Sequence, residues 1–196
     1  MGSLARKQLE EWVKKIPVRG RVLDVGGAQN DLKHRVFSWH VKDYVCMDLE
    51  QPHESKHHVD YIQDIQKDLN TSQFDYYEGY FDQVFVLEVS EYWHDPMKAL
   101  KNINRLMTDF GELYISFHTL YGLHPPAGED CLRYTKNAIV KMMKEAGFKI
   151  EDIVEKRMTG EGEHHLLNFY KSQGMRCSWG DSQLLCEGYL IKAIKE

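Results

Sequence analysis

Apolar residues recur along this chain with two periods, one of three to four residues and one close to two. The longer period is typical of helices that bury one face. It predicts helices over 3–15, 31–39, 96–107 and 135–146. Pro17 and Gly20 close the first of them, Asp95 precedes the third as a cap, and Gly147 ends the fourth.

Short runs rich in β-branched and aromatic residues separate these helices and predict strands. The runs cover 21–25, 44–47, 59–62, 81–89, 113–117, 148–154 and 188–194. Between them, we expect mostly loop over 68–80 and a turn over 109–111. Because strands and helices alternate from 21 to 154, we expect a doubly wound α/β fold with a mainly parallel sheet and helices on both faces.

The 196 residues suit a single domain. We divide it into an N-terminal helix (1–20), a core (21–154), and an insertion with the final strand (155–196). Within the last part, 157–183 is long and polar, with one apolar group of residues at 166–170. A segment of this length without a clear pattern is more often a lid or binding insertion than a connector.

Composition narrows the class of protein. The chain is 42% hydrophobic and 28% charged and has no run of 18 apolar residues, so we expect no membrane span. The first residues, "MGSLARKQLEEWVKK", alternate charged and apolar side chains, so we expect no secretory signal and a cytoplasmic location. A net charge of -5 disfavours nucleic acid as a partner. The four cysteines show no C-x-x-C pairing, which favours reduced thiols; they are Cys46, Cys131, Cys177 and Cys186.

The stretch "RVLDVGGAQNDL" places a carboxylate, Asp24, inside an apolar strand just before Gly26 and Gly27. A buried carboxylate is costly unless something there uses it. Glycines after a strand let a ligand approach the backbone closely. Asp48 ends the next strand 22 positions beyond Gly26, the separation at which an acid binds a ribose diol in nucleotide-binding units.

The turn does not match the phosphate-binding motifs. A dinucleotide fingerprint requires G-x-G-x-x-G, but counting from Gly26 the later glycine positions hold Ala28 and Asp31, and no G-K-[ST] motif is present. Asp31 at the opening of the following helix would repel a pyrophosphate. These residues favour a nucleoside ligand that carries positive charge and no phosphate, and they disfavour a dehydrogenase.

Five blocks follow one another along the chain: "VLDVGGA", "VCMDLE", "QDIQKDL", "FDQVFVLEVSEYWHDPMKALKNINRLMTDFGELYISF" and "HPPAGEDCLRYTKNAIVKMMKEAGF". In this order they resemble the class I methyltransferases that use S-adenosylmethionine (SAM), in their small-molecule, type 11-like branch. The resemblance covers about 21–154. It implies a Rossmann-like seven-stranded sheet with helices on both faces and an antiparallel last strand. The chain departs from the family pattern at Ala28, at Tyr92 and at 109–111.

The resemblance also implies where SAM binds. The cofactor-binding set would be Asp24, Gly26, Gly27, Ala28, Asp48, Leu49, Asp64, Ile65, Leu87 and Glu88. The glycine turn would line the methionine part, Asp48 would hold the ribose, and Asp64 with Ile65 would meet the adenine. Leu87 and Glu88 would close the pocket. The simpler alternatives are that Asp24 braces its own turn and that the other acids are ordinary strand-end residues.

Candidate residues for the acceptor follow the fourth and fifth strands. His118 and His124 are candidate catalytic bases, because imidazole titrates near neutral pH. The candidate substrate residues are Tyr92, Trp93, Arg133 and Tyr134, with Trp179 as a further wall. Arg133 could equally anchor its loop to Asp130, and the aromatic residues could belong to the core.

Ten histidines raise the question of a metal site. The pairs 57–58 and 164–165 consist of adjacent residues, which point to opposite faces of a strand, and no H-x-x-x-H or H-E-x-x-H pattern occurs. We therefore expect no metal.

We interpret the chain as a SAM-dependent enzyme that methylates an O or N atom of a small polar acceptor, a metabolite or, from the resemblance, a sugar. Two alternatives remain. A nucleic-acid methyltransferase is disfavoured because "LEVSEYW" replaces the Asn/Asp-Pro-Pro-aromatic block of the base-methylating enzymes. A non-catalytic cofactor-binding partner protein is suggested by the departures at Ala28, Tyr92 and Phe110. The oligomeric state is left open.

Overall fold

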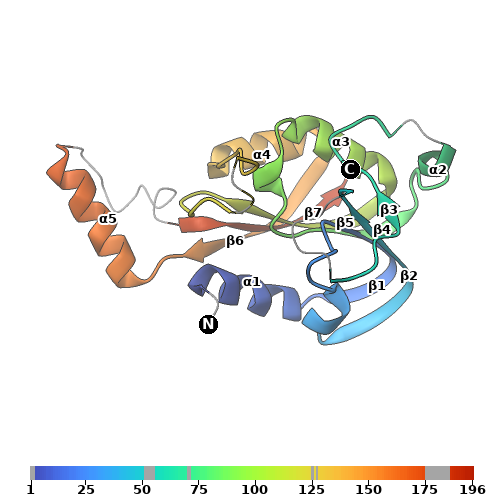
Figure 1. The fold of residues 1–196 in the computed structure, drawn as a ribbon, viewed down its shortest axis with the longest axis horizontal. Coiled ribbons are helices and arrows are strands. Elements are labelled where there is room, and N and C mark those ends of the chain that lie inside the picture. The colour runs from blue at the N-terminus through green and yellow to red at the C-terminus, as the bar shows by residue number, and fades with distance from the viewer. Residues whose placement is uncertain (1–2, 51–55, 70–71, 125, 127, 175–185) are drawn as a thin grey trace.

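The computed structural model describes residues 3–50, 56–69, 72–124, 126, 128–174 and 186–196 (Figure 1). Its strands form one seven-stranded sheet in the order β3-β2-β1-β4-β5-β7-β6. The strands are β1 (Pro17–Val25), β2 (Ser38–Asp48), β3 (Tyr61–Ile62), β4 (Phe81–Val86), β5 (Met107–His118), β6 (Phe148–Arg157) and β7 (Cys186–Lys195). The helices are α1 (Leu4–Lys14), α2 (Ser72–Asp75), α3 (Pro96–Leu106), α4 (Lys136–Glu145) and α5 (Gly160–Ser172), with 3-10 turns η1 (Leu32–Arg35) and η2 (Ser90–Tyr92).

The pairing of the strands confirms the predicted fold class. β1 pairs in parallel with β2 and β4, and β4 pairs in parallel with β5. β7 runs antiparallel to both β5 and β6. The chain moves outward from β1 through β2 to β3 and then returns to the other side of β1 as β4. The strand order therefore reverses at β1, and sheets of this kind bind ligands beyond the carboxyl ends of the strands at such a switch point.

Helices cover both faces of the sheet, with α1 on one face and α3 and α4 on the other (Figure 1). Leu9 and Val13 of α1 belong to one buried apolar cluster, and Leu100 and Ile103 of α3 belong to a second, larger one. These pairs lie three or four positions apart, so each helix buries a single stripe. Among the described residues, apolar clusters thus pack on both faces of the sheet.

The predicted caps are confirmed. The side chain of Asp95 accepts a hydrogen bond from the amide of Lys98, with Pro96 in the first helical turn of α3. Gly147 follows α4 at φ +82°, a conformation that favours glycine. Local sequence signals thus define the ends of both helices on this face.

One predicted helix is wrong. The range 31–39 contains only the short turn η1, and β2 already begins at Ser38. β2 pairs with β1 along the whole length of both strands, and β1 starts at Pro17 rather than at 21. Val36 and Trp39 therefore pack against the α1 cluster from an extended chain. Pairing with β1 overrides a local apolar spacing that fits a helix equally well.

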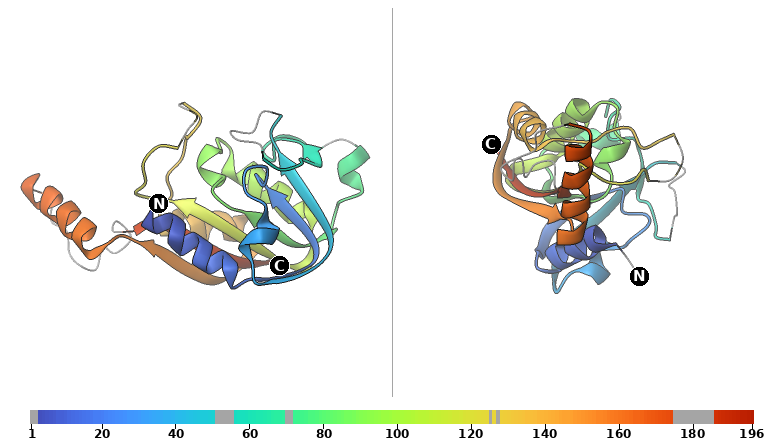
Figure 2. Two further views of the ribbon diagram at one scale, coloured as in Figure 1. Left: turned by 60° about the horizontal axis from the view of Figure 1, so that its bottom comes forward. Right: turned by 90° about the vertical axis from the view of Figure 1, so that its left-hand side faces the viewer.

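Two predicted irregular segments also differ. The range 109–111 lies inside β5, where Phe110 adopts φ +62°, so the expected turn is an irregularity in a long strand. Residues 160–172 of the expected insertion form α5, which reaches away from the rest of the molecule (Figure 2). Only Leu167 of α5 is buried, while Phe169 is exposed. Residues 175–183 of that insertion, with Cys177 and Trp179, lie outside the described residues.

Two further findings concern the cysteines and the lengths of the helices. Among the described residues, Cys46, Cys131 and Cys186 form no disulfide. Within the described ranges, no helix combines the length and apolar character that crossing a membrane requires.

The contact between β7 and its neighbours depends on Gly188. A Cβ at this position would lie 2.2 Å from the carbonyl oxygen of Phe117 and 2.9 Å from Cε of Lys156. We predict that Gly188→Ala lowers the free energy of unfolding by about 2–3 kcal/mol, because backbone and a buried side chain must shift. Urea denaturation would measure this. Gly160→Ala, where a Cβ would meet no described atom within 4 Å, should change it by less than about 0.5 kcal/mol; equal losses in the two variants would contradict the explanation.

Candidate functional site

The glycine turn after β1 lies at the carboxyl end of the strand where the strand order reverses. Gly26 adopts φ +78°, and its amide donates to the carbonyl of Met47 on β2 at 2.8 Å. A Cβ on Gly26 would lie 2.3 Å from Cγ2 of Val89, which follows β4. Glycine is therefore required both by the backbone conformation and by the neighbouring side chain. The turn is packed between the ends of β2 and β4.

Asp24 braces this turn from inside the sheet. Its Oδ2 accepts a hydrogen bond from the hydroxyl of Tyr44 at 2.6 Å, and the side chain is almost fully buried. A Cβ on Gly27 would lie 2.6 Å from the same oxygen. Burial raises the pKa of Asp24 to about 6, although the Tyr44 hydrogen bond and the charge of Arg35 oppose the rise. The geometry thus matches the simpler alternative for Asp24, as a brace behind the turn.

Asp48 stands beside the turn at the end of β2. Its Oδ2 accepts from the amide of Ala28 at 3.0 Å, and its Oδ1 accepts from the amide of Leu49 at 2.8 Å. Burial raises the pKa of Asp48, and these two amides oppose the rise. An ionised carboxylate has about four acceptor sites, so it can still receive two hydroxyl groups. The side chain of Leu49 is half exposed next to it.

The third and fourth strand ends complete this edge. Asp64 accepts from the amide of Gln66, and Ile65 is buried in the larger core cluster. Asn102 of α3 donates to the carbonyl oxygens of Ile65 and Lys67, so α3 fixes this loop. Its backbone is therefore held rigidly at the edge of the sheet.

Leu87 and Glu88 follow β4. Leu87 is buried in the α1 cluster, and Glu88 adopts φ +61°, which is unusual for a residue with a side chain. Such a conformation costs about 1–3 kcal/mol and persists only where its surroundings impose it. The amide of Glu88 donates to Oγ of Ser116 at 2.7 Å, which helps to hold it. The strain directs the carboxylate of Glu88 toward the end of β5.

At that point five ionisable side chains from four segments form a buried group, which we call the acid–histidine cluster: Glu88, Glu91, His118, His124 and Lys156. Nε2 of His118 lies 3.3 Å from Oε1 of Glu88 and 3.2 Å from Oε1 of Glu91. Nδ1 of His124 lies 2.8 Å from Oε1 of Glu91. Nζ of Lys156 donates to Glu88 at 3.0 Å. Only Glu88 and His124 reach the surface, with 17% and 20% of their side chains exposed.

The charges in the cluster support one another. Burial is the largest single effect and would raise the pKa values of Glu88 and Glu91. The imidazole of His118, together with Lys156 at Glu88 and with His124 at Glu91, outweighs burial, and both pKa values are lowered. Burial alone would lower the pKa of His118, but the two carboxylates raise it above its usual value. Both glutamates are therefore carboxylates at neutral pH.

Sequence reasoning missed Glu91 and Lys156. Glu91 lies in "LEVSEYW", where the family pattern quoted above also has a glutamate, so a signal was present. Lys156 lies beyond the predicted end of its strand, and nothing in the local sequence marks it as buried. Its side chain is fully buried in the structure.

The candidate substrate residues lie at different depths. Arg133 forms a bidentate ion pair with Asp130 and donates to the carbonyl of Gly122, so it anchors its loop. Trp93 is buried in the core, and the buried Tyr134 donates from its hydroxyl to the carbonyl of Ser90. Tyr92, by contrast, is partly exposed and stacks on His124 with ring centres 6.4 Å apart.

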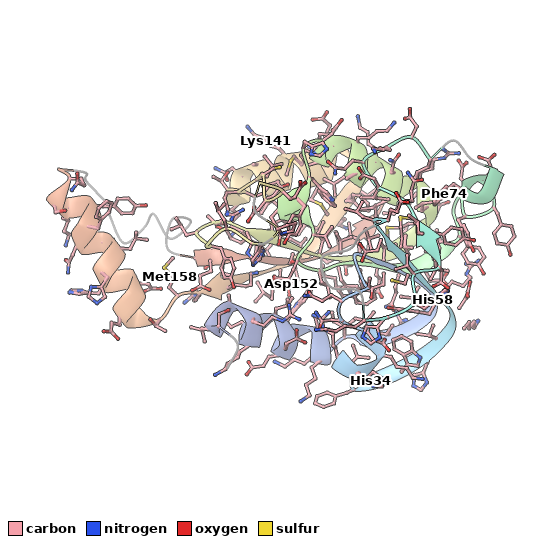
Figure 3. The ribbon with its side chains drawn as sticks, in the orientation of Figure 1. His34, His58, Phe74, Lys141, Asp152 and Met158 are labelled. Atoms are coloured by element: carbon pink, nitrogen blue, oxygen red, sulfur yellow. The ribbon has the colours of Figure 1, made fainter. Side chains whose placement is uncertain are left out.

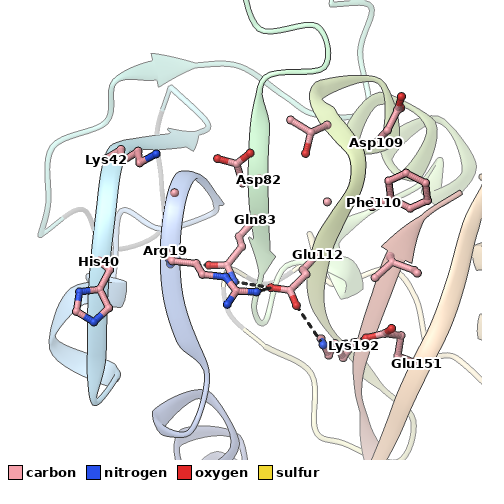
Figure 4. A pocket seen from close by; sticks show the side chains of 14 residues that line it. Arg19, His40, Lys42, Asp82, Gln83, Asp109, Phe110, Glu112, Glu151 and Lys192 are labelled. Carbon is pink, nitrogen blue, oxygen red and sulfur yellow. Dashed lines mark hydrogen bonds and ion pairs between the residues drawn. The ribbon is translucent and has the colours of Figure 1, made fainter.

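A hollow of about 610 Å³ lies at the opposite end of the sheet, where the parallel strands β4 and β5 begin (Figure 4). It is lined by residues near the amino ends of β4 and β5, including Gln83, Glu112 and Phe110, and by Lys192 of β7. Gln83 and Lys192 both bond to Glu112. Because the glycine turn and Asp48 lie at the other end, this hollow is separate from the candidate site.

The residues at the carboxyl edge fit an adenosyl sulfonium ligand. The glycine turn lets the ligand approach the backbone, Asp48 retains acceptor capacity for a diol, and the carboxylates favour a cation. Val89 packs on Gly26, and its neighbours Glu88 and Glu91 belong to the acid–histidine cluster. The cofactor edge and the cluster are therefore joined through one short segment, as a two-substrate reaction requires.

Asp24→Asn tests the interpretation of Asp24 as a buried brace. Because burial raises its folded pKa from 3.8 to about 6, the ionised residue destabilises the fold, and the stability present at low pH is lost as pH rises through 6. The difference corresponds to about 3 kcal/mol at 1.36 kcal/mol for each pH unit. We predict that Asp24→Asn gains stability over the wild type by up to about that amount between pH 4 and 7.5. Asn can still accept from Tyr44.

Urea denaturation of the two proteins across this pH range measures the difference. Asp152→Asn, at an exposed acid of β6 (Figure 3), is the matched control and should run parallel to the wild type. Parallel curves for Asp24→Asn would show that the carboxyl group is not buried in solution.

Comparisons with known proteins bear on this site. The family model described as a methyltransferase domain matches residues 1–153. Comparison with curated proteins finds no match. Among solved structures, a SAM-dependent methyltransferase from Mesorhizobium loti is 13% identical, with a TM-score of 0.63 over 98% of this chain and 100% of that one.

Two further solved structures share the fold. A 1,6-didemethyltoxoflavin-N1-methyltransferase from Burkholderia thailandensis is 15% identical, with a TM-score of 0.60 over 97% of this chain and 76% of that one. A phosphoethanolamine N-methyltransferase from Haemonchus contortus is 13% identical, with a TM-score of 0.58 over 97% and 52%. The chain belongs to the methyltransferase domain family, the SAM-dependent class that its strand-end motifs predicted.

Proposed function

We propose that this protein transfers the methyl group of SAM to an O or N atom of a small polar acceptor, a metabolite or a sugar. The observation that carries the proposal is the junction after β4. Val89 packs on the cofactor turn while Glu88 and Glu91 enter the acid–histidine cluster. A donor bound at the turn and an acceptor bound at the cluster would thus be neighbours.

Asp48 and the glycine turn would hold the cofactor. Asp48 would receive the ribose hydroxyls, and the loop at Asp64 and Ile65 would face the adenine. Leu87 and Glu88 would border the methyl end. When bound, SAM supplies an electrophilic methyl group on a positively charged sulfur. Positioning two reactants in this way can contribute several kcal/mol to the barrier reduction.

His124 is the better candidate for a base. Glu91 accepts from Nδ1 of His124 at 2.8 Å, which leaves Nε2 to receive a proton. His124 is one-fifth exposed, whereas His118 is fully buried and can act only by positioning its neighbours. As the acceptor atom attacks the methyl carbon, its proton would pass to His124. The carbon–sulfur electron pair would stay on sulfur and give S-adenosylhomocysteine (SAH).

The acceptor class rests on three supports. The Burkholderia thailandensis structure holds 1,6-didemethyltoxoflavin, and a second Haemonchus contortus structure holds phosphomonomethylethanolamine, both small molecules. The net charge of -5 does not favour nucleic acid. Tyr92 is partly exposed and stacks on His124, so it would place an aromatic ring beside the acceptor. The sugar alternative comes from the sequence resemblance.

Binding of SAH tests the cofactor site. We predict that Asp48→Asn weakens binding of SAH by about tenfold or more, because an amide cannot accept two ribose hydroxyls as the carboxylate can. Isothermal titration calorimetry would measure it. Asp43→Asn is the matched control on the same strand, where the carboxylate accepts from Tyr80, and it should bind like the wild type. No binding of SAH to the wild type would overturn the proposed function.

Turnover tests the acceptor side. Incubation with SAM and a panel of sugars, amino sugars and hydroxy or amino compounds should release SAH with at least one of them. With that acceptor, we predict that His124→Ala lowers kcat by about 100-fold or more, as expected for loss of a general base. His34→Ala, at an exposed histidine, should leave kcat unchanged. Binding of SAH without turnover on any acceptor would favour the non-catalytic partner protein instead.

A further inference from the structure

The acid–histidine cluster has the chemistry of a metal site. One ligand atom each from Glu88, His118 and His124 lies within 4.8 Å of the other two. Glu91 adds a second carboxylate, 3.2 Å from Nε2 of His118. In a tetrahedral site with bonds of 2.0–2.2 Å, ligand atoms lie about 3.3–3.6 Å apart. The distances of 3.2 and 3.3 Å from His118 to the two carboxylates are close to that spacing.

Two polar atoms of the cluster are buried without a hydrogen-bond partner among the described residues. Nε2 of His118 is buried and has no hydrogen-bond partner among the described residues, although two carboxylate oxygens are near. Oε2 of Glu91 is likewise buried and, within the same residues, unpartnered. A buried polar atom without a partner is costly. Ligand atoms that converge without hydrogen-bond geometry are what a cation between them would satisfy.

The positively charged ammonium of Lys156 lies close to these ligand atoms, so it must be compatible with a bound cation. Its ammonium donates to Oε1 of Glu88 at 3.0 Å and lies 3.5 Å from Nδ1 of His118, whereas the unpartnered atom is Nε2. It can therefore remain bonded to Glu88 as an outer partner, as the carboxylate ligands of metals commonly have. With both imidazoles neutral, two carboxylates and one ammonium leave one net negative charge. A divalent ion changes this to one net positive charge, which an anionic oxygen would neutralise.

We propose that the acid–histidine cluster binds one divalent transition-metal ion through Glu88, His118, His124 and the carboxylate of Glu91. Two imidazole and two carboxylate ligands suit Zn²⁺, Mn²⁺ or their neighbours, and do not suit Mg²⁺, which prefers oxygen ligands alone. No metal-ligand spacing marks this site in the sequence, because the ligands come from three separate segments.

The role of the ion rests on the proposed function. An acceptor hydroxyl bound to it would lose its proton to solvent near neutral pH, as zinc-bound water does. The ion takes the place of the proton between Glu91 and His124, so His124 is a ligand in the metal-bound protein and a base in the metal-free protein.

The test uses the full chain, stripped with EDTA and then titrated with Zn²⁺, Mn²⁺ or Mg²⁺. Calorimetry and elemental analysis after gel filtration should find one Zn²⁺ or Mn²⁺ per chain and no Mg²⁺. His124→Ala and Glu88→Gln should weaken binding at least as much as loss of an outer partner, about 10- to 100-fold. His165→Ala, at an exposed histidine of α5, should bind like the wild type. Circular dichroism verifies that each variant is folded.

Absence of Zn²⁺ and Mn²⁺ binding, or binding that survives both cluster substitutions, would overturn the proposal. Titration of metal-free protein with SAH separates this result from the proposed function. If the protein binds SAH but no metal, the proposed function stands and the metal site is rejected. If it binds metal but no SAH, the metal site stands and the proposed function is rejected.

Discussion

The packing of Val89 against Gly26 is the contact on which the site depends. No side chain larger than hydrogen fits at Gly26, because its Cβ would overlap Cγ2 of Val89. That contact sets the distance between the turn after β1 and the segment after β4. The same segment continues into Glu88 and Glu91, so the position of the buried charges is tied to the position of the turn. The glycine turn and the acid–histidine cluster are therefore held in position by the same segment.

The buried charges are expensive for the fold. Removing several ionised groups from water costs more than their mutual attraction returns, unless each charge is paired. Here the pairing is close, and Glu88 also accepts a strained backbone conformation at φ +61°. A chain that needed only stability would fill this space with apolar side chains. The retention of five ionisable groups at the carboxyl edge of the sheet is therefore an argument for chemistry at that edge.

Local signals in the sequence were sufficient for the fold. Glycine after β1, apolar runs in the strands and caps such as Asp95 report on nearby residues, and they predicted a mainly parallel α/β sheet. The 31–39 range failed because its apolar spacing fits a helix, and only pairing of β2 with β1 decides otherwise. The grouping of the acid–histidine cluster was not predicted for the same reason, although Glu88, His118 and His124 were each named as candidate site residues. Glu88, His118 and Lys156 are 30 or more positions apart from one another, and no local pattern reports such a meeting.

Lys156 also constrains a distant part of the chain. Its stem lies where β7 passes without a side chain, at Gly188, and the two strands pair at these residues. A lysine can enter the interior here only because its neighbour leaves the space. Across related proteins, positions 156 and 188 should therefore vary together: a bulkier residue at 188 would require a shorter one at 156, and with it a different partner for Glu88.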